Sequence, residues 1–413
     1  MTLVLSGVTG IRNRGVEALV RAAIAGFARH LPGEPTTVLS TDPQYDSLAL
    51  AGTASVVADV PAFFGSGKVQ RYLRQVKAAV RPVNKTRRAV EVLKSATAVI
   101  ASGGDVFSSD YNTLRHHVGH VEIAQAFGRP TIFLAHSIGP FKTKGEANLM
   151  KSVLERATLI TVRESRTRRY LIEELQVPAD RVHLTADVAF LLEPAPAERI
   201  LQLRRWLGLD GSSYVALAPS EGITTFSSAK DGEAHDRAWV RTIERILRFS
   251  DDLVLIVPHV QDVRPTGDDR RIATRLLDAV GYNPRVRLAS GELSAGDFKG
   301  LIQGSRYLIG ERMHACIAGL STAVPTIALG YSVKAQGIME DLLGSKVSDD
   351  GLHLPVAAFV ASDGLAREID AITRNNAGIR QRLAEAAVQA KRLADANFVA
   401  MREALHGHVR AAA

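Results

Sequence analysis

The segment YLIGERMHACIAGLSTAVPTIALG, residues 307–330, decides the fold. A short apolar run, Tyr307–Ile309, leads into Gly310 and a polar loop, and a helix-length segment follows. A second short apolar run, Thr326–Leu329, closes the pattern. Short strands that alternate with helices are typical of parallel βαβ units, because parallel strands need a long crossover connection. The segment therefore predicts one βαβ unit of a doubly wound α/β sheet.

The same alternation recurs on both sides of a proline-containing break at Glu193–Pro196. Each proline disfavours helix at the residue before it, so we interpret this stretch as a linker. We expect two α/β domains, residues 1–193 and 194–376, with a cleft at their junction, and a closing segment, 377–413, that holds a long helix. The other expected strands are Leu3–Leu5, Thr97–Ile100, Thr131–Ala135, Leu159–Val162, Tyr214–Ala218, Leu253–Val257 and Val286–Leu288.

The composition is that of a globular protein, with 46% hydrophobic and 23% charged residues among 413, which excludes disordered and collagen-like classes. Cys316 is the single cysteine, so no disulfide framework forms within the chain. No apolar run approaches the roughly 18–20 residues that span a bilayer, and the first residues lack a signal-peptide pattern. We expect a cytoplasmic protein, and the net charge of +8 favours anionic partners.

Basic side chains follow two neighbouring expected strands, where ligands of open α/β sheets bind. Arg312 and His314 follow Tyr307–Ile309 at the start of a helix, and Lys334 follows Thr326–Leu329. Helix N-termini favour anions, arginine suits a carboxylate or phosphate, and histidine exchanges a proton near neutral pH. These residues could converge on one small anion. The alternative is structural: Arg312 pairs with Glu311, His314 packs, and Lys334 is solvated.

The run from Glu311 to Leu343 resembles the C-terminal signature of the polysaccharide pyruvyl transferase family. The sequence departs from the family pattern at two positions. The family's first loop often ends Gly-Asp, whereas Val16 follows Gly15 here. Ser102 replaces the first glycine of the family's glycine-rich loop. The acceptor therefore stays open. Four further motifs resemble the family in the same order: Ser102–Phe107, His136–Phe141, Thr161–Ser165 and Ala186–Phe190.

The resemblance implies transfer of pyruvate from phosphoenolpyruvate to two hydroxyls of one sugar, which forms a cyclic ketal and releases phosphate. It implies two Rossmann-like domains facing a cleft, similar to the glycosyltransferase-B architecture. The donor is then expected on 194–376, the acceptor on 1–193, and the helix of 377–413 packed back on the first domain. We expect no cofactor beyond the donor substrate. The acceptor is expected in a cell-surface glycan or its lipid-linked precursor.

Donor-side roles follow from this resemblance and from charge. We assign His314 as the general acid, or as a phosphate ligand that assists departure. Arg312 would hold the carboxylate and Lys334 the phosphate. Arg163 directly follows a strand and is a second candidate anion ligand. The alternative for Arg163 is a solvated helix start beside Glu164.

Acceptor-side candidates lie in the loops of the first domain. Asp105 follows a glycine-rich turn and is the candidate base, with a helix N-cap as the alternative. Ser137, Asp187 and Asn13 are candidate acceptor ligands. Asp187 alternatively caps a turn, and Asn13 alternatively satisfies loop backbone. We reject a serine hydrolase, because His136 is adjacent to Ser137 in sequence and no third group orients the pair.

Two further features have alternative interpretations. His116, His117 and His120 have helical spacing that suits a metal, yet no carboxylate accompanies them, so we expect a solvated helix face and no metal. Residues 68–94 hold nine Lys and Arg and one acid, Glu91. Their spacing predicts a basic amphipathic helix, either an ordinary domain helix or a peripheral contact with the inner face of a membrane. Nucleic-acid motifs do not accompany the charge, so we expect no nucleic-acid partner.

The main rival is a nucleotide-sugar-dependent glycosyltransferase or epimerase of the same architecture. Such enzymes often grip ribose with a carboxylate in the C-terminal domain. Between residues 300 and 344 the glutamates are Glu311 and Glu340, and no pair has the seven-residue spacing familiar from these enzymes. The absence of this spacing makes the nucleotide-sugar enzyme the less favoured interpretation, but it stays an alternative.

Overall fold

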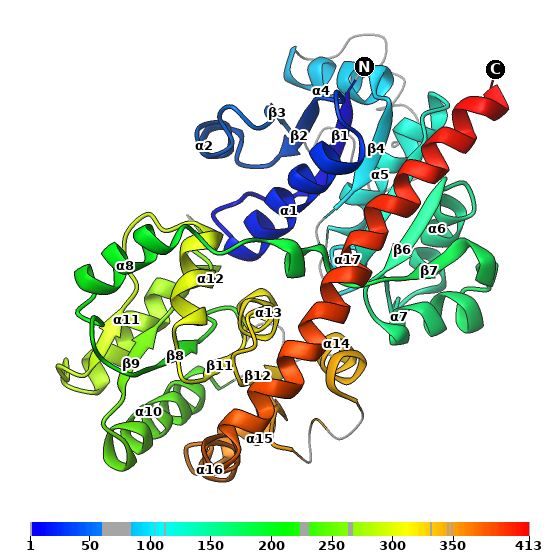
Figure 1. Ribbon diagram of the computed structural model, residues 1–413. Helices are drawn as coiled ribbons and strands as arrows, with labels where there is room; N and C mark the ends of the chain where they lie inside the picture. The colour runs from blue at the N-terminus through cyan, green and yellow to red at the C-terminus, as the bar shows by residue number, and fades with distance from the viewer. Residues whose placement is uncertain are drawn as a thin grey trace. The chain divides into compact units, whose positions relative to one another are not determined.

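The chain forms two compact units in a computed structural model (Figure 1). Unit 1 comprises residues 1–11, 19–188 and 392–413, and unit 2 comprises 12–18 and 189–391. The chain thus enters unit 2 at Ala189, ahead of the expected linker, and residues 12–18 belong to unit 2. The described residues are 2–59, 84–102, 104–110, 113–223, 231–262, 267–330, 333–344, 347 and 350–412, without the side chains of 84–86, 333–335 and 408–412.

Unit 1 is built on a seven-stranded parallel sheet with the order β3-β2-β1-β4-β5-β6-β7. Nearly all residues of the central strands are buried, because helices cover both faces of such a sheet. The order reverses between β1 and β4, which marks the point where doubly wound sheets bind ligands. The strands are β1 Leu3–Val8, β2 Thr36–Ser40, β3 Ser55–Ala58, β4 Ala98–Ala101, β5 Thr131–His136, β6 Leu159–Val162 and β7 Val182–Leu184.

The helices of unit 1 bury apolar side chains against this sheet. One core cluster joins Val118 and Phe133 to Met150, and another joins Val4 and Leu93 to Ala124. The helices are α1 Arg14–His30, α2 Pro43–Ala49, α4 Asn84–Ser95, α5 Leu114–Ala126, α6 Lys144–Leu154 and α7 Ser165–Arg169, which continues as a π-helix over Tyr170–Glu174.

Unit 2 is built on a six-stranded parallel sheet with the order β10-β9-β8-β11-β12-β13. Its order reverses between β8 and β11. The strands are β8 Tyr214–Ala218, β9 Leu253–Ile256, β10 Val286–Leu288, β11 Leu308–Gly310, β12 Thr326–Gly330 and β13 His353–Pro355. The helices are α8 Ala197–Trp206, α10 Gly232–Phe249, α11 Asp269–Ala279, α12 Ala295–Gln303, α13 Met313–Ser321, α14 Val333–Leu343, α15 Val356–Ala361 and α16 Ala366–Arg374.

The final helix, α17 (Asn376–Ala412), contributes to both units. In unit 1, Phe398 lies directly over Gly26, where a Cβ would collide with the ring. The buried Asn397 accepts a hydrogen bond from the Thr185 hydroxyl at 2.9 Å and donates one to the Ala186 carbonyl at 3.0 Å. Because Thr185 and Ala186 directly follow β7, these bonds fix the helix at the end of that strand of unit 1.

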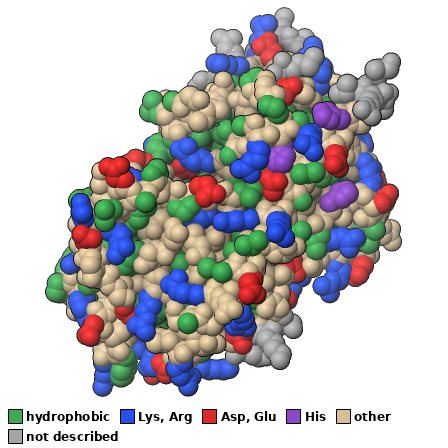
Figure 2. Space-filling model, viewed as in Figure 1, with side chains coloured by type: hydrophobic (Ala, Val, Ile, Leu, Met, Phe, Trp, Pro, Cys, Tyr) green, Lys and Arg blue, Asp and Glu red, His purple; other side chains and the backbone are tan. Residues whose placement is uncertain are grey.

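The α/β fold with two parallel sheets confirms the expected fold class. Within the described residues, no helix combines the length and apolar character that crossing a bilayer demands. On the face drawn in Figure 2, basic and acidic side chains are interspersed. The net charge of +8 is therefore not gathered into one large basic patch on that face.

Candidate functional site

The carboxyl ends of β8 and β11, where the order of the second sheet reverses, are joined by Glu311. Its carboxylate accepts a hydrogen bond from the Ser220 backbone N–H at 2.7 Å and lies 2.6 Å from His235 Nε2. Burial would lower the pKa of His235, but contacts with Asp236 and Glu311 outweigh burial and raise it to about 9. Glu311 therefore forms its ion pair with His235, and the alternative of an Arg312–Glu311 pair is wrong.

Arg312 is the residue before α13, and its partner is Asp269 at the start of α11. The guanidinium donates from Nε to Asp269 Oδ2 at 3.0 Å and from Nη2 to Oδ1 at 2.5 Å. Asp269 is fully buried and also accepts from the backbone N–H groups of Val260 and Glu221. This bidentate ion pair holds Arg312 in a defined orientation at the N-terminus of α13.

His314 is the second residue of α13 and lies beside another histidine, His259, which follows β9. Burial lowers the pKa of His259 well below its usual value, and electrostatic interactions with His314, Arg312 and Arg14 lower it further. His259 therefore stays neutral next to three cationic or protonatable side chains. Neither of its ring nitrogens hydrogen-bonds to any described residue.

Arg14 reaches this cluster because residues 12–18 pair with the loop after β9. The Arg14 backbone N–H donates to the His259 carbonyl at 3.0 Å. Its guanidinium is 2% exposed and lies 3.1 Å from Glu17 and 2.8 Å from Glu292. We call Arg14, His259, Arg312 and His314 the cationic cluster; Arg14 and His259 were not predicted as site residues.

Two other predicted ligands of this region have different outcomes. Asn13 Oδ1 accepts a hydrogen bond from the Gly15 N–H at 3.0 Å, and Asn13 forms a bridge with Val260. Asn13 thus has at least the local backbone role named as its alternative. Lys334 belongs to α14, but its side chain lies outside the described residues.

In unit 1, Arg163, Ser137 and Asp187 form one buried network at the ends of β5, β6 and β7. Arg163 donates from Nη1 to Asp187 at 2.6 Å and from Nε to the Ser137 hydroxyl at 2.8 Å. Burial would lower the pKa of Arg163, but Asp187, Glu164 and Asp105 raise it. The alternative of a solvated helix start is therefore wrong for Arg163.

Asp105 lies beside this network and is partly exposed. It is not the cap of the next described helix, because α5 begins at Leu114 with Thr113 at its N-cap. The ring nitrogens of His136 face backbone carbonyls rather than Ser137: Nε2 lies 2.9 Å from the Ala101 oxygen and Nδ1 lies 3.2 Å from the Gly104 oxygen. That geometry agrees with rejecting a serine nucleophile–base pair.

The solvated face expected for His116, His117 and His120 is wrong. His117 is 2% exposed and His120 is fully buried. Asp59, which directly follows β3, supplies the carboxylate that the sequence spacing did not reveal, and it lies against His116 and His120. In the basic segment 68–94, residues 68–83 lie outside the described residues, and α4 carries an exposed Arg87–Glu91 pair at 2.8 Å.

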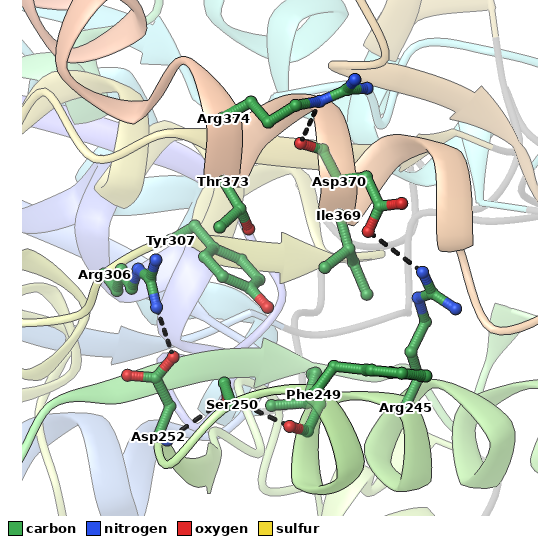
Figure 3. A pocket seen from close by; sticks show the side chains of 11 residues that line it. Arg245, Phe249, Ser250, Asp252, Arg306, Tyr307, Ile369, Asp370, Thr373 and Arg374 are labelled. Carbon is green, nitrogen blue, oxygen red and sulfur yellow. Dashed lines mark hydrogen bonds and ion pairs between the residues drawn. The ribbon is translucent and has the colours of Figure 1, made fainter.

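A pocket of about 280 Å³ lies at the opposite, amino-terminal edge of the second sheet (Figure 3). Asp252 and Tyr307 directly precede β9 and β11 there. Two of its arginines are paired with carboxylates, Arg306 with Asp252 at 2.9 Å and Arg245 with Asp370 at 3.0 Å. Because ligands of such sheets bind at the carboxyl edge, the cationic cluster is the better candidate site.

Comparison with known proteins places the chain among enzymes of polysaccharide synthesis. The sequence pattern of the family "Polysaccharide pyruvyl transferase" matches residues 13–333. The chain is 23% identical over 337 residues to the amylovoran biosynthesis protein AmsJ of Erwinia amylovora, covering 79% of this chain and 74% of that one.

Solved structures share the fold at low identity. HepE of Anabaena, in complex with UDP and glucose, superposes with a TM-score of 0.59 at 14% identity and 99% coverage of both chains. The UDP-GlcNAc 2-epimerase of Neisseria meningitidis, bound to UDP-GlcNAc, gives 0.60 at 13% identity, covering 95% of this chain and 97% of that one. A glycosyltransferase from Rickettsia africae gives 0.58 at 13% identity, covering 99% and 97%. The fold is thus that of glycosyltransferase-B enzymes and these epimerases.

Proposed function

The chain belongs to the polysaccharide pyruvyl transferase family, and we propose that it transfers the pyruvyl group of phosphoenolpyruvate to two hydroxyls of one sugar. The product is a cyclic ketal on a cell-surface glycan or its lipid-linked precursor, and phosphate is released. The similarity to a protein of amylovoran biosynthesis supports a polysaccharide acceptor.

The cationic cluster is the observation that carries this proposal. Phosphoenolpyruvate is small and bears a carboxylate and a phosphate, so its receptor must supply several positive groups in a small volume. Arg14, Arg312 and His314 surround neutral His259 at the carboxyl edge of the second sheet. The N-terminus of α13 adds backbone N–H groups and a favourable dipole. Such a constellation suits a donor that carries both a carboxylate and a phosphate.

The proposed roles follow from these positions. Arg312, oriented by Asp269, binds the donor carboxylate, and Lys334 binds the phosphate. His314 gives a proton to the methylene carbon of the donor, which develops positive character at the neighbouring carbon. One sugar hydroxyl adds there and loses its proton. Phosphate then departs, and the second hydroxyl adds to the same carbon and loses its proton. Of the two hydroxyl protons, one replaces the proton that His314 gave to the methylene carbon, and the other leaves with phosphate.

The acceptor side is proposed for unit 1. Asp105 is the candidate base, because it is partly exposed beside the buried Arg163 network. Arg163 and Asp187 are bonded to each other, so we propose that they, with Ser137, shape the acceptor loop rather than take up the donor. Asn13, which belongs to unit 2, is also proposed as an acceptor ligand. A cytoplasmic location and a peripheral membrane contact through 68–94 also stay proposals.

The test uses phosphoenolpyruvate labelled in the pyruvyl carbons and a polysaccharide acceptor stripped of its ketals by mild acid. We expect label to enter the polymer with equal release of phosphate, and mild acid to return the label as pyruvate. Arg312→Ala should abolish incorporation, whereas Arg306→Ala, whose arginine is paired with Asp252 at the other edge of the sheet, should retain it. Phosphate release without label in the polymer contradicts the transfer.

A further inference from the structure

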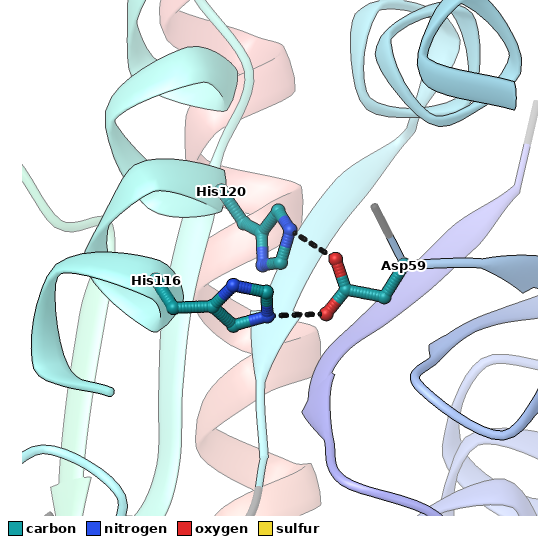
Figure 4. Close-up of side chains that lie close together, drawn as sticks. All are labelled: Asp59, His116 and His120. Atoms are coloured by element: carbon teal, nitrogen blue, oxygen red, sulfur yellow. Dashed lines mark hydrogen bonds and ion pairs between the residues drawn. The ribbon is translucent and has the colours of Figure 1, made fainter. Parts of the chain in front are cut away.

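A second constellation of polar side chains lies in unit 1, where Asp59, His116 and His120 converge (Figure 4). Asp59 directly follows β3, and the two histidines are one turn apart on α5. His116 Nε2 lies 2.8 Å from one carboxylate oxygen of Asp59, and His120 Nε2 lies 2.9 Å from the other. Each carboxylate oxygen thus faces one imidazole ring, as the close-up shows.

The ligand set has the composition of a transition-metal site. Two imidazole nitrogens and one carboxylate oxygen are common ligands of Zn²⁺ and its neighbours. All three ligand atoms lie within 4.8 Å of one another. A tetrahedral Zn²⁺ with bonds of about 2.0–2.1 Å holds its ligand atoms about 3.3 Å apart. The N···O contacts of 2.8 and 2.9 Å are shorter than this, so binding of the ion requires the side chains to move apart by about half an ångström.

Burial separates this cluster from an ordinary surface pair. The side chains of Asp59 and His120 are fully buried and that of His116 is 14% exposed. A comparable His–Asp contact, His30 with Asp395 at 2.9 Å, has one histidine and a carboxylate that is 33% exposed. Burying a carboxylate between two histidines is costly unless its charge is compensated. A divalent cation held by all three groups compensates it directly.

We propose that Asp59, His116 and His120 bind a divalent transition-metal ion of the zinc class. Three protein ligands leave the remaining coordination position for water. Strand β3 is one of the two edge strands of the first sheet. The ion therefore ties the end of this edge strand to α5, and binding to the folded state alone raises its stability.

The experiment uses untagged full-length protein freed of metal by a chelator and dialysed. We expect calorimetric titration with Zn²⁺ to give one site per chain, and Zn²⁺ to raise the melting temperature until chelator is added. Mg²⁺ should do neither, because it prefers oxygen ligands. Co²⁺ should give the strong visible absorption of a tetrahedral site. No binding of Zn²⁺ or Co²⁺ by the folded protein overturns the proposal.

Two variants test which histidine binds the ion. His116→Gln should weaken Zn²⁺ binding at least tenfold, whereas the matched His30→Gln should leave it unchanged. Equal binding by His116→Gln and the wild type contradicts the proposal. Zinc-edge X-ray absorption of the wild type needs no variant: we expect scattering from two imidazoles, and a spectrum without imidazole scattering overturns the assignment. These readouts do not depend on transferase activity.

Discussion

Gly15 lies directly against the imidazole of His314, and a Cβ built on Gly15 would be 2.5 Å from His314 Nδ1. The two residues meet because residues 12–14 pair with the loop after β9, within unit 2. A real Cβ cannot come that close, so only glycine leaves the His314 ring in its observed place.

The first prediction follows from this contact. Gly15→Ala should displace His314 and lower kcat at least tenfold, about 1.4 kcal/mol in barrier height. Gly232→Ala is the matched control, because it lies at the start of α10 with nothing within 4 Å of an added Cβ. Steady-state kinetics measure both. Wild-type kcat in Gly15→Ala would show that the position of His314 does not matter.

Arg312→Lys tests the bidentate ion pair between Arg312 and Asp269. Lysine keeps the positive charge but cannot form the paired hydrogen bonds of the guanidinium. We expect the KM for phosphoenolpyruvate to rise about tenfold or more, a difference of about 1.4 kcal/mol, while Arg306→Lys stays near the wild type. If Arg312→Lys keeps the wild-type KM, charge alone explains donor binding and the orientation by Asp269 is irrelevant.

His235 makes folding stability depend on pH. Its folded-state pKa is about 9, above its ordinary value of 6.5, so protonation stabilises the folded state. This contribution, on the order of 3 kcal/mol, is fully present below pH 6.5 and is lost as pH rises through 9. We expect the melting-temperature difference between wild type and His235→Gln to shrink over this window. A difference that is constant from pH 6 to 9.5 would exclude a charged His235–Glu311 pair.

Asn397 should be important for the stability of unit 1. Asn397→Ala removes its bonds to Thr185 and Ala186 and leaves buried polar groups unsatisfied, each of which costs about 1–3 kcal/mol. We expect a clear fall in melting temperature, whereas Val388→Ala, which changes an exposed side chain of the same helix, should have little effect. Equal effects of the two substitutions would contradict the role of Asn397.

Much of the fold could be predicted because the buried strands of parallel sheets are short apolar runs. Tyr214–Ala218 and Leu159–Val162 were predicted with the bounds that the structure has. The edge strand β3 was missed because it is only partly buried and short, with two partly exposed residues and one exposed residue. Strand β13 was missed for a similar reason, since it is three residues long and ends at Pro355.

The candidate site could be predicted only where its residues are close in sequence. Arg312 and His314 were found from one strand–helix junction. Asp269 and His259 come from other elements, and no local pattern links them to Arg312. Asp59 was missed in the same way, since only the sheet brings it to α5. Partners that meet through topology leave no spacing signal in a single sequence.

The most direct test of donor identity is calorimetric titration with phosphoenolpyruvate, with UDP and UDP-glucose titrated in parallel. We predict that phosphoenolpyruvate binds the wild type, that Arg312→Ala loses this binding, and that Arg306→Ala retains it. Tight binding of UDP or UDP-glucose, with none of phosphoenolpyruvate, would contradict the account and favour a nucleotide-sugar enzyme of the same fold.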